Sequence, residues 1–290
     1  MMKQLLQTKC PTTGWAVLVC AITLSIGCKG QSYVSPEGYD ITKPQKENLG
    51  KVLNEISGIC FNNDDNTLLA ISDSKEKVFQ INVNKQKLKD YTDKVVGSNS
   101  DLEDIVKVDS AVYLLSSKGV IYEVPHKKDT IRTYTFPSSD QNDFETLYYD
   151  PSVKSLILVC KACPADKGKS MRSAYRFDLS KKQFEPSPFF TFSTEDVKKL
   201  LKDDNAKFDP SAACIHPVNK RLYILSSAGN LLVITDTRGK IIEAYKLNEE
   251  QFPQAEGIAF APNGDMFITN EGKFGAPTLQ EFKYKNVKKN

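Results

Sequence analysis

The stretch Gln254-Ala255-Glu256-Gly257-Ile258-Ala259-Phe260 places an acidic residue and a small residue before a short apolar run. The same pattern recurs earlier in the 290-residue chain, at residues 55–61, 101–106, 143–149 and 209–215. If Glu55, Glu103, Glu145, Ser211 and Glu256 are equivalent, successive copies are 48, 42, 66 and 45 residues apart. Periods of this size are typical of solenoids and propellers, in which each repeat is one supersecondary unit.

Each copy of the motif begins a series of short strand-like runs. After Glu103, for example, runs rich in Val, Ile, Leu and Tyr occupy residues 111–117, 120–124 and 130–134. Short runs of this kind, bounded by Gly, Asn, Asp or Lys, predict β-strands. Four strands per repeat is the composition of a propeller blade. The sequence therefore predicts an all-β protein, a β-propeller with five blades.

Two segments depart from the regular repeat. The third repeat is long because it contains a loop at 163–171 and a predicted surface helix at 193–201, with Ser193 as its cap. A divergent blade hidden in this repeat would instead give six blades. The last repeat lacks a fourth strand, and residues 39–42 resemble an outer strand without a blade. Pairing the two would close the ring and leave no open strand edge.

The N-terminus has the features of an export signal. Two lysines precede an apolar run over residues 15–26, which ends in small residues before Cys28 and is short for a transmembrane helix. The pattern resembles a bacterial lipobox, so we predict a lipid anchor at Cys28. An ordinary secretory signal with an incidental Cys28 is the alternative. The predicted parts are a lipoprotein signal peptide (1–27), a tether (28–38) and the propeller domain (39–290).

Either kind of signal places the domain outside the cytoplasm, and the lipid anchor places it in the cell envelope. No acidic residue follows Cys28 immediately, which in a Gram-negative cell favours the periplasmic side of the outer membrane. The chain has 39 Lys and Arg against 36 Asp and Glu, so it lacks the basic excess that nucleic-acid binding needs. We expect a monomer attached to the membrane by its lipid.

Four cysteines follow the export segment. Cys60 and Cys214 occupy equivalent apolar positions in two repeats, where small buried thiols are expected. Cys160 and Cys163 form a CxxC pair, which serves as structural thiols, as a disulfide, as a redox centre or as half of a metal site. No second CxxC completes a zinc site, so structural thiols or a disulfide are favoured.

A propeller brings equivalent positions of its innermost strands together near the central axis. Glu55, Glu103, Glu145 and Glu256 are therefore predicted to converge there, and carboxylates at close range repel one another unless a cation or hydrogen-bond donors compensate. Hard oxygen ligands without imidazole or thiolate favour Ca²⁺. The alternative is that each carboxylate caps backbone N–H groups or pairs with Arg or Lys.

A second set of polar residues follows each acidic motif, at the end of the second strand of each repeat. Most of these residues are expected to form turns. The charged ones, and two acids that lie two places before Glu103 and Ser211, are predicted to line the mouth of the channel as ligand contacts. This predicted set comprises Asp73, Asp101, Lys118, Lys161, Asp209 and Glu271.

Four of the motifs, in order, carry a family resemblance: residues 54–59, 101–105, 209–213 with His216-Pro217, and 253–258. Together they look like the SdiA-regulated, or YjiK-like, family of bacterial exported β-propellers. Asp104 and Thr146 depart from the pattern because they stand where glycine is usual. The resemblance implies an envelope propeller with links to calcium. The Glu256-Gly257-Ile258 element is also similar to that of calcium-dependent lactonase propellers, whose catalytic histidines have no counterpart here.

These observations favour a non-catalytic, lipid-anchored envelope propeller that binds Ca²⁺ in its channel, with a ligand or protein partner at the channel mouth. The alternative is a metal-dependent hydrolase of lactones, esters or phosphoesters. The chain offers that enzyme few bases, since His126 and His216 are its only histidines. A third alternative is a purely structural ring whose faces bind proteins.

Overall fold

The computed structural model describes residues 33–285 except 76, 84–86, 94–95, 98–99, 126–129, 139–140 and 274. These residues all belong to one compact unit, which begins at Tyr33. The predicted signal peptide, Cys28 and His126 lie outside the described residues. Among the described residues, no helix has the length and apolar character needed to cross a membrane.

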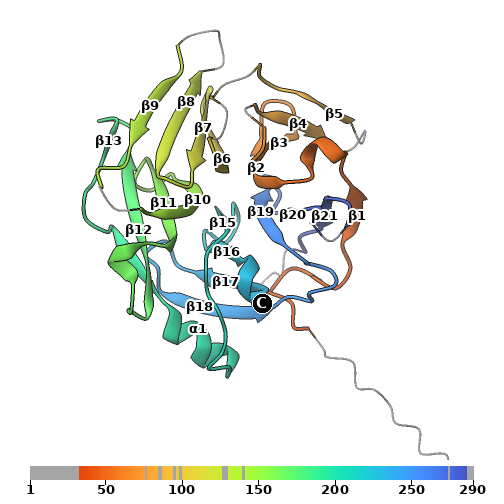
Figure 1. The fold of residues 1–290 in the computed structure, drawn as a ribbon. Coiled ribbons are helices and arrows are strands. Elements are labelled where there is room, and N and C mark those ends of the chain that lie inside the picture. The colour runs from red at the N-terminus through yellow and green to blue at the C-terminus, as the bar shows by residue number, and fades with distance from the viewer. Residues whose placement is uncertain are drawn as a thin grey trace, which may run out of the picture. The chain divides into compact units, whose positions relative to one another are not determined.

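Five antiparallel sheets surround a central axis, and each sheet is one blade (Figure 1). Blade 1 contains β2 (Ile56–Asn62), β3 (Thr67–Ser72), β4 (Phe79–Asn82) and β5 (Lys87–Asp90). Blade 2 contains β6 (Leu102–Val108), β7 (Ala111–Ser116), β8 (Val120–Pro125) and β9 (Arg132–Thr135). Blade 3 contains β10 (Asp143–Asp150), β11 (Ser155–Ala162), β12 (Met171–Asp178), β13 (Gln183–Phe184) and β14 (Phe190–Ser193).

Blade 4 contains β15 (Ala212–Ile215), β16 (Leu222–Ser226), β17 (Leu231–Thr235) and β18 (Ile241–Lys246). Blade 5 contains β19 (Ala255–Phe260), β20 (Met266–Asn270), β21 (Thr278–Phe282) and β1 (Gln45–Asn48). The 3₁₀ turns are η1 (Lys51–Leu53), η2 (Pro164–Asp166) and η3 (Ser227–Gly229). The innermost strands β2, β6, β10, β15 and β19 contact one another in this order, and β19 contacts β2. The five-bladed prediction is therefore confirmed.

The ring is closed by an N-terminal strand, as predicted, but the strand is not the predicted one. Strand β1 pairs with β21 from Gln45↔Glu281 to Asn48↔Thr278, whereas residues 39–42 form no strand. Tyr39 and Ile41 are instead buried against blades 4 and 5. Their apolar character suggested a strand but reflects this packing, while polar residues suit the exposed edge strand β1.

Blade 3 carries the predicted insertion. Helix α1 (Thr194–Leu201) follows β14, and its N-cap Ser193 accepts a hydrogen bond from Asp196 N at 3.1 Å. Val197 is buried on the inner side of the helix, and Leu200 is exposed. Strands β13 and β14 pair with successive parts of the same edge of β12, so the extra length adds neither a blade nor a further row to the sheet.

The core of the described chain lies between the blades, with one apolar cluster at each of the five blade interfaces. Successive residues of a strand point to opposite faces of its sheet, so each second strand supplies two clusters. In β7, Leu114 packs toward blade 1 and Leu115 toward blade 3. In β16, Ile224 packs toward blade 3 and Leu225 toward blade 5. This sharing fixes the position of each inner strand against its neighbours.

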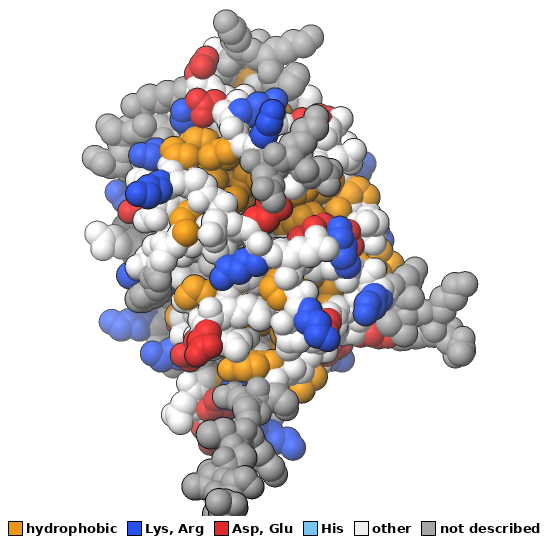
Figure 2. All heavy atoms as spheres, turned by 90° about the vertical axis from the view of Figure 1, so that its right-hand side faces the viewer, with side chains coloured by type: hydrophobic (Ala, Val, Ile, Leu, Met, Phe, Trp, Pro, Cys, Tyr) orange, Lys and Arg blue, Asp and Glu red, His pale blue; other side chains and the backbone are white. Residues whose placement is uncertain are grey.

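Figure 2 shows one face of the molecule, on which basic and acidic side chains are interspersed among polar ones. Apolar side chains occur there in small separate groups. Among the described residues, the large hydrophobic side chains that are exposed are scattered along the chain, at Val34, Val52, Leu200 and Val218.

Candidate functional site

One position in each blade faces a common cavity of about 180 Å³ in the channel. These five positions are Ser57, Glu103, Glu145, Ser211 and Glu256. In blades 2, 3 and 5 the glutamate falls at a β-bulge, because the pairing skips it between Leu102 and Asp104, between Phe144 and Thr146, and between Ala255 and Gly257. An unpaired bulge residue turns its side chain out of the ladder. The bulges thus direct the glutamates into the cavity.

The residue after each bulge sits where neighbouring blades come closest. A Cβ atom at Gly58 of blade 1 would collide with the Asp104 side chain of blade 2, and one at Gly257 of blade 5 would lie 2.9 Å from Ser57 O of blade 1. In blade 2 the equivalent residue is Asp104, whose buried carboxylate accepts hydrogen bonds from Leu147 N and Ile105 N, at 2.7 and 2.8 Å. Asp104 therefore departs from the family glycine because it ties blade 2 to blade 3.

Glu55 is not part of this ring, contrary to the prediction. Its carbonyl accepts the N–H of Asp73, as the carbonyls of Asp101 and Gln254 accept the N–H groups of Ser117 and Glu271. Glu55 therefore aligns with the residue two places before each ring position. Its side chain is exposed and does not line the cavity. The ring position in blade 1 is Ser57, which aligning Gly58 with Gly257 would have identified.

A second set of side chains completes the cavity lining: Asp73, Lys161, Gln254 and Glu271. Asp73, Lys161 and Glu271 are predicted residues; Asp73 and Glu271 directly follow the second strand of their blade, and Lys161 lies at the end of the second strand of blade 3, β11. Lys161 Nζ forms an ion pair with Glu145 Oε1. The cavity thus collects five carboxylates and one ammonium group from four blades.

The other predicted mouth residues lie outside this cavity. Lys118 is exposed in the β7–β8 turn, and the equivalent position in blade 2 is Ser117, whose hydroxyl donates to Asp101. Asp209 forms an ion pair with Arg172. Arg172 was not among the residues predicted from the sequence. Arg172 could not be found from the repeats because it lies at the start of β12, directly after the loop inserted at 163–171.

Crowding and burial keep the cavity carboxyls from ionising at their usual pH. Burial, and then the Glu145 and Asp101 carboxylates, raise the pKa of Glu103 to about 9. Burial and the Glu145 carboxylate raise the pKa of Glu256 to about 7, against hydrogen bonds from Ser227 and Gln254. Burial also raises the pKa of Glu145, although Lys161 opposes that rise. At neutral pH the cavity therefore holds protons that a bound cation would displace.

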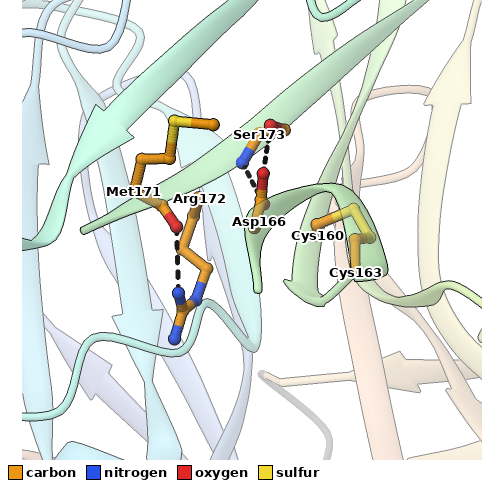
Figure 3. Close-up of a disulfide and its surroundings, with 6 residues drawn as sticks. All are labelled: Cys160, Cys163, Asp166, Met171, Arg172 and Ser173. Atoms are coloured by element: carbon orange, nitrogen blue, oxygen red, sulfur yellow. Dashed lines mark hydrogen bonds between the residues drawn. A yellow bond between two sulfur atoms is a disulfide. The ribbon is translucent and has the colours of Figure 1, made fainter. Parts of the chain in front are cut away.

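The CxxC pair next to Lys161 is a disulfide, which confirms the structural interpretation of these cysteines (Figure 3). Cys160 and Cys163 are both buried. Turn η2 follows, and its buried Asp166 accepts hydrogen bonds from Ser173 N and Oγ at 2.7 and 2.6 Å. Figure 3 shows Asp166 lying between the disulfide and β12. The end of β11 that carries Lys161 is thus held on both sides.

The donor chemistry of the cavity fits Ca²⁺, since carboxylate, hydroxyl and carboxamide oxygens line it. Among the described residues, however, no group of three or more His, Cys, Asp or Glu side chains is close enough to hold a metal ion. Glu145 is bound to Lys161. A calcium ion would therefore need the ring side chains to draw inward or water to complete its shell.

His216 takes no part in the cavity. It is fully buried, its Nδ1 accepts hydrogen bonds from Val218 N and Asn219 N, and its Nε2 lies 2.7 Å from Tyr39 Oη. Tyr39 donates its hydroxyl proton to Gly264 O, so His216 is neutral with its proton on Nε2. Cys60 and Cys214 are free thiols that pack against apolar clusters, but they are half-buried rather than buried as predicted; desolvation raises their pKa values.

The fold resembles several solved propellers at low sequence identity. A luciferin-regenerating enzyme aligns over 84% of this chain and 97% of its own, with a TM-score of 0.53 and 14% identity. Regucalcin from Agrobacterium tumefaciens, described as calcium-binding, aligns over 86% and 95%, with a TM-score of 0.50 and 12% identity. The PQQ-bound aldose sugar dehydrogenase from Streptomyces coelicolor aligns over 87% and 100%, with a TM-score of 0.50 and 11% identity. These likenesses establish the fold alone.

No curated protein matches the chain in sequence. The family model described as SdiA-regulated matches residues 32–274, which include all five inner strands and the whole cavity lining. The chain therefore belongs to the SdiA-regulated family.

Proposed function

We propose that this protein is a non-catalytic envelope propeller that binds Ca²⁺ in the ring of Glu103, Glu145 and Glu256. The observation that carries the proposal is the convergence of these glutamates, from three blades, in one cavity of about 180 Å³. Burial, and then neighbouring carboxylates, raise the pKa values of these glutamates, so ionising them in the folded protein without a cation carries a free-energy penalty. A divalent ion would remove that penalty.

Calcium suits this cavity better than other metals. Its ligands would be the ring carboxylates, the hydroxyls of Ser57 and Ser211, and the Gln254 amide oxygen, with water in the remaining positions. No imidazole or thiolate lines the cavity among the described residues, which disfavours zinc and copper. When bound, the ion would supply positive charge at the axis and draw the blades' inner strands together.

A ligand or protein partner would bind in a groove beside the channel mouth. A groove of about 640 Å³ shares Glu271 with the channel cavity. Its other walls come from the edge strand β1, the connection between blades 4 and 5, and the loop before β21; examples are Lys46, Pro253 and Ala276. A partner bound there would contact Glu271, so calcium in the ring would change the charge that the partner meets.

The proposed attachment to the cell envelope rests on Cys28 and the segment before it. The apolar run and the small residues before Cys28 support lipidation at its sulfur and attachment to the outer membrane. Labelled palmitate should be incorporated into the wild type and not into Cys28→Ser. Equal labelling of both proteins, or recovery of the wild type in the soluble fraction, would refute the anchor.

The hydrolase alternative has less support from the described residues. Neither a histidine nor a cysteine lines the cavity among them, and the described histidine, His216, is committed to Tyr39 and two backbone N–H groups. Lys161 is paired with Glu145, and its pKa is raised, so it is a poor base. Turnover of a lactone or phosphoester panel would favour the enzyme.

Thermal unfolding with and without calcium tests the proposal. A hundredfold excess of CaCl₂ over Kd should add about 2.7 kcal/mol to the unfolding free energy of the wild type. Glu103→Gln and Glu256→Gln should abolish this increase. Glu195→Gln, which removes a carboxylate from the surface of α1, is the matched control and should keep it. An equal calcium response in all four proteins, or none in the wild type, would refute the ring as the site.

A further inference from the structure

Lys161 is the one cationic side chain among the described residues that line the channel cavity. Its ammonium group is bound to Glu145 and also interacts with Asp143 and Glu256. Glu271, at the mouth, is affected by the same charge. Lys161 therefore lies where several acids of the cavity share its positive charge, which is the place that a metal ion would take.

The backbone that carries Lys161 is unusually well fixed. The Cys160–Cys163 disulfide encloses it in a small ring, and both cysteines are buried. Cys160 pairs with Phe144 in the β10–β11 ladder, directly beside the bulge that presents Glu145. Because backbone and partner are both held, only the flexible four-carbon arm of Lys161 can move the ammonium group away from Glu145.

We propose that Lys161 is a built-in counter-cation that competes with the metal, so that a divalent ion binds the ring only when the ammonium group leaves Glu145. This inference rests on the proposed calcium function and adds its regulation. Lys161 would keep the carboxylates compatible with folding when calcium is scarce, and would set the calcium concentration at which the ring fills.

The expected effect follows from charge. An ammonium group repels a divalent ion bound beside it. Removing that positive charge increases the binding affinity of the ion by more than a factor of ten, even at an effective dielectric constant of about 20. Lys161→Gln should therefore bind Ca²⁺ at least about tenfold more tightly than the wild type. A lysine that only stabilised the fold would have the opposite effect, because its loss would loosen the ring and weaken calcium binding.

Calcium titration calorimetry of the wild type, Lys161→Gln, Lys161→Arg and Lys246→Gln at pH 7.5 tests the inference. Lys246 is the matched control because it forms an ion pair with Asp203 at the outer edge of blade 4. Lys161→Gln should gain affinity, while Lys161→Arg, which keeps the charge, and Lys246→Gln should match the wild type. Calcium binding by the wild type with no gain in Lys161→Gln would overturn the inference and leave the calcium function intact. No calcium binding by any of them would overturn both.

A double variant keeps the test decisive if Lys161→Gln is poorly folded in the absence of metal. Glu145→Gln with Lys161→Gln removes both members of the pair and leaves the cavity charge as in the wild type. Its affinity should fall back toward the wild-type value, since the gain in Lys161→Gln comes from the freed Glu145 carboxylate. A double variant that binds as tightly as Lys161→Gln would show that Glu145 is not the group for which lysine and metal compete.

Discussion

Replacing Glu103 by Gln should make the metal-free protein more stable at alkaline pH, although it removes a ring residue. Burial and the neighbouring carboxylates raise the pKa of Glu103 to about 9, from an ordinary value of 4.5. Between these two values the folded state holds a proton that the unfolded state has lost. Stability therefore falls as pH rises through this window, by up to about 1.4 kcal/mol per pH unit. Glutamine is isosteric and cannot ionise, so the variant escapes this loss.

The difference between variant and wild type should be near zero at pH 5. By pH 8 it should reach about 3 kcal/mol, since three pH units at the full slope give about 4 and the partly open cavity reduces it. Urea unfolding at pH 5, 6, 7 and 8 in the presence of a chelator measures the difference. Glu195→Gln should show no such trend, because its carboxylate is on the surface of α1. A Glu103→Gln protein that is less stable than the wild type at pH 8, or a difference that does not grow with pH, would refute the electrostatic account.

Three further predictions concern the frame around the cavity. Asp104→Ala leaves the buried Leu147 N–H without an acceptor and should lower the free energy of unfolding in urea by about 1–3 kcal/mol. An unchanged unfolding midpoint would show that this hydrogen bond does not hold blades 2 and 3 together. Burial lowers the pKa of His216 to about 4, so its stabilising effect is complete above pH 6.5 and is lost as pH falls through 4. His216→Phe should lack this acid-dependent loss, of about 3 kcal/mol, when melting is compared between pH 7 and 4. Cys160→Ser with Cys163→Ser should lower the unfolding free energy by about 2 kcal/mol, and no loss would mean that the disulfide does not hold the β11 end.

The sequence predicted most of the fold because strand-forming runs and the repeat spacing are local signals. The five blades, the helix after Ser193 and the structural role of Cys160 are all confirmed. The closing strand was misplaced because residues 45–48 are polar and are defined as a strand only by their partner β21. No local pattern marks such a strand, since its hydrogen bonds come from the other end of the chain.

The residues of the candidate site could be predicted only where the motif itself shows which residue occupies the cavity-facing position. Glu103, Glu145 and Glu256 do line one cavity, because each occupies the bulge position of its inner strand. Glu55 was misplaced because the nearest acid was matched instead of Gly58. The Lys161–Glu145 ion pair depends on side-chain direction at a bulge, which the spacing of residues does not specify.

The central claim is that calcium replaces protons in the Glu103–Glu145–Glu256 ring. Calcium titration calorimetry at pH 7, repeated in buffers with different ionisation enthalpies, counts the protons released for each ion bound. At this pH Glu103 is protonated and Glu256 is about half protonated, so one ion should bind with release of about one to two protons. Glu103→Gln should show neither calcium binding nor proton release. Absence of binding at millimolar calcium, or binding with no proton release, would contradict the claim.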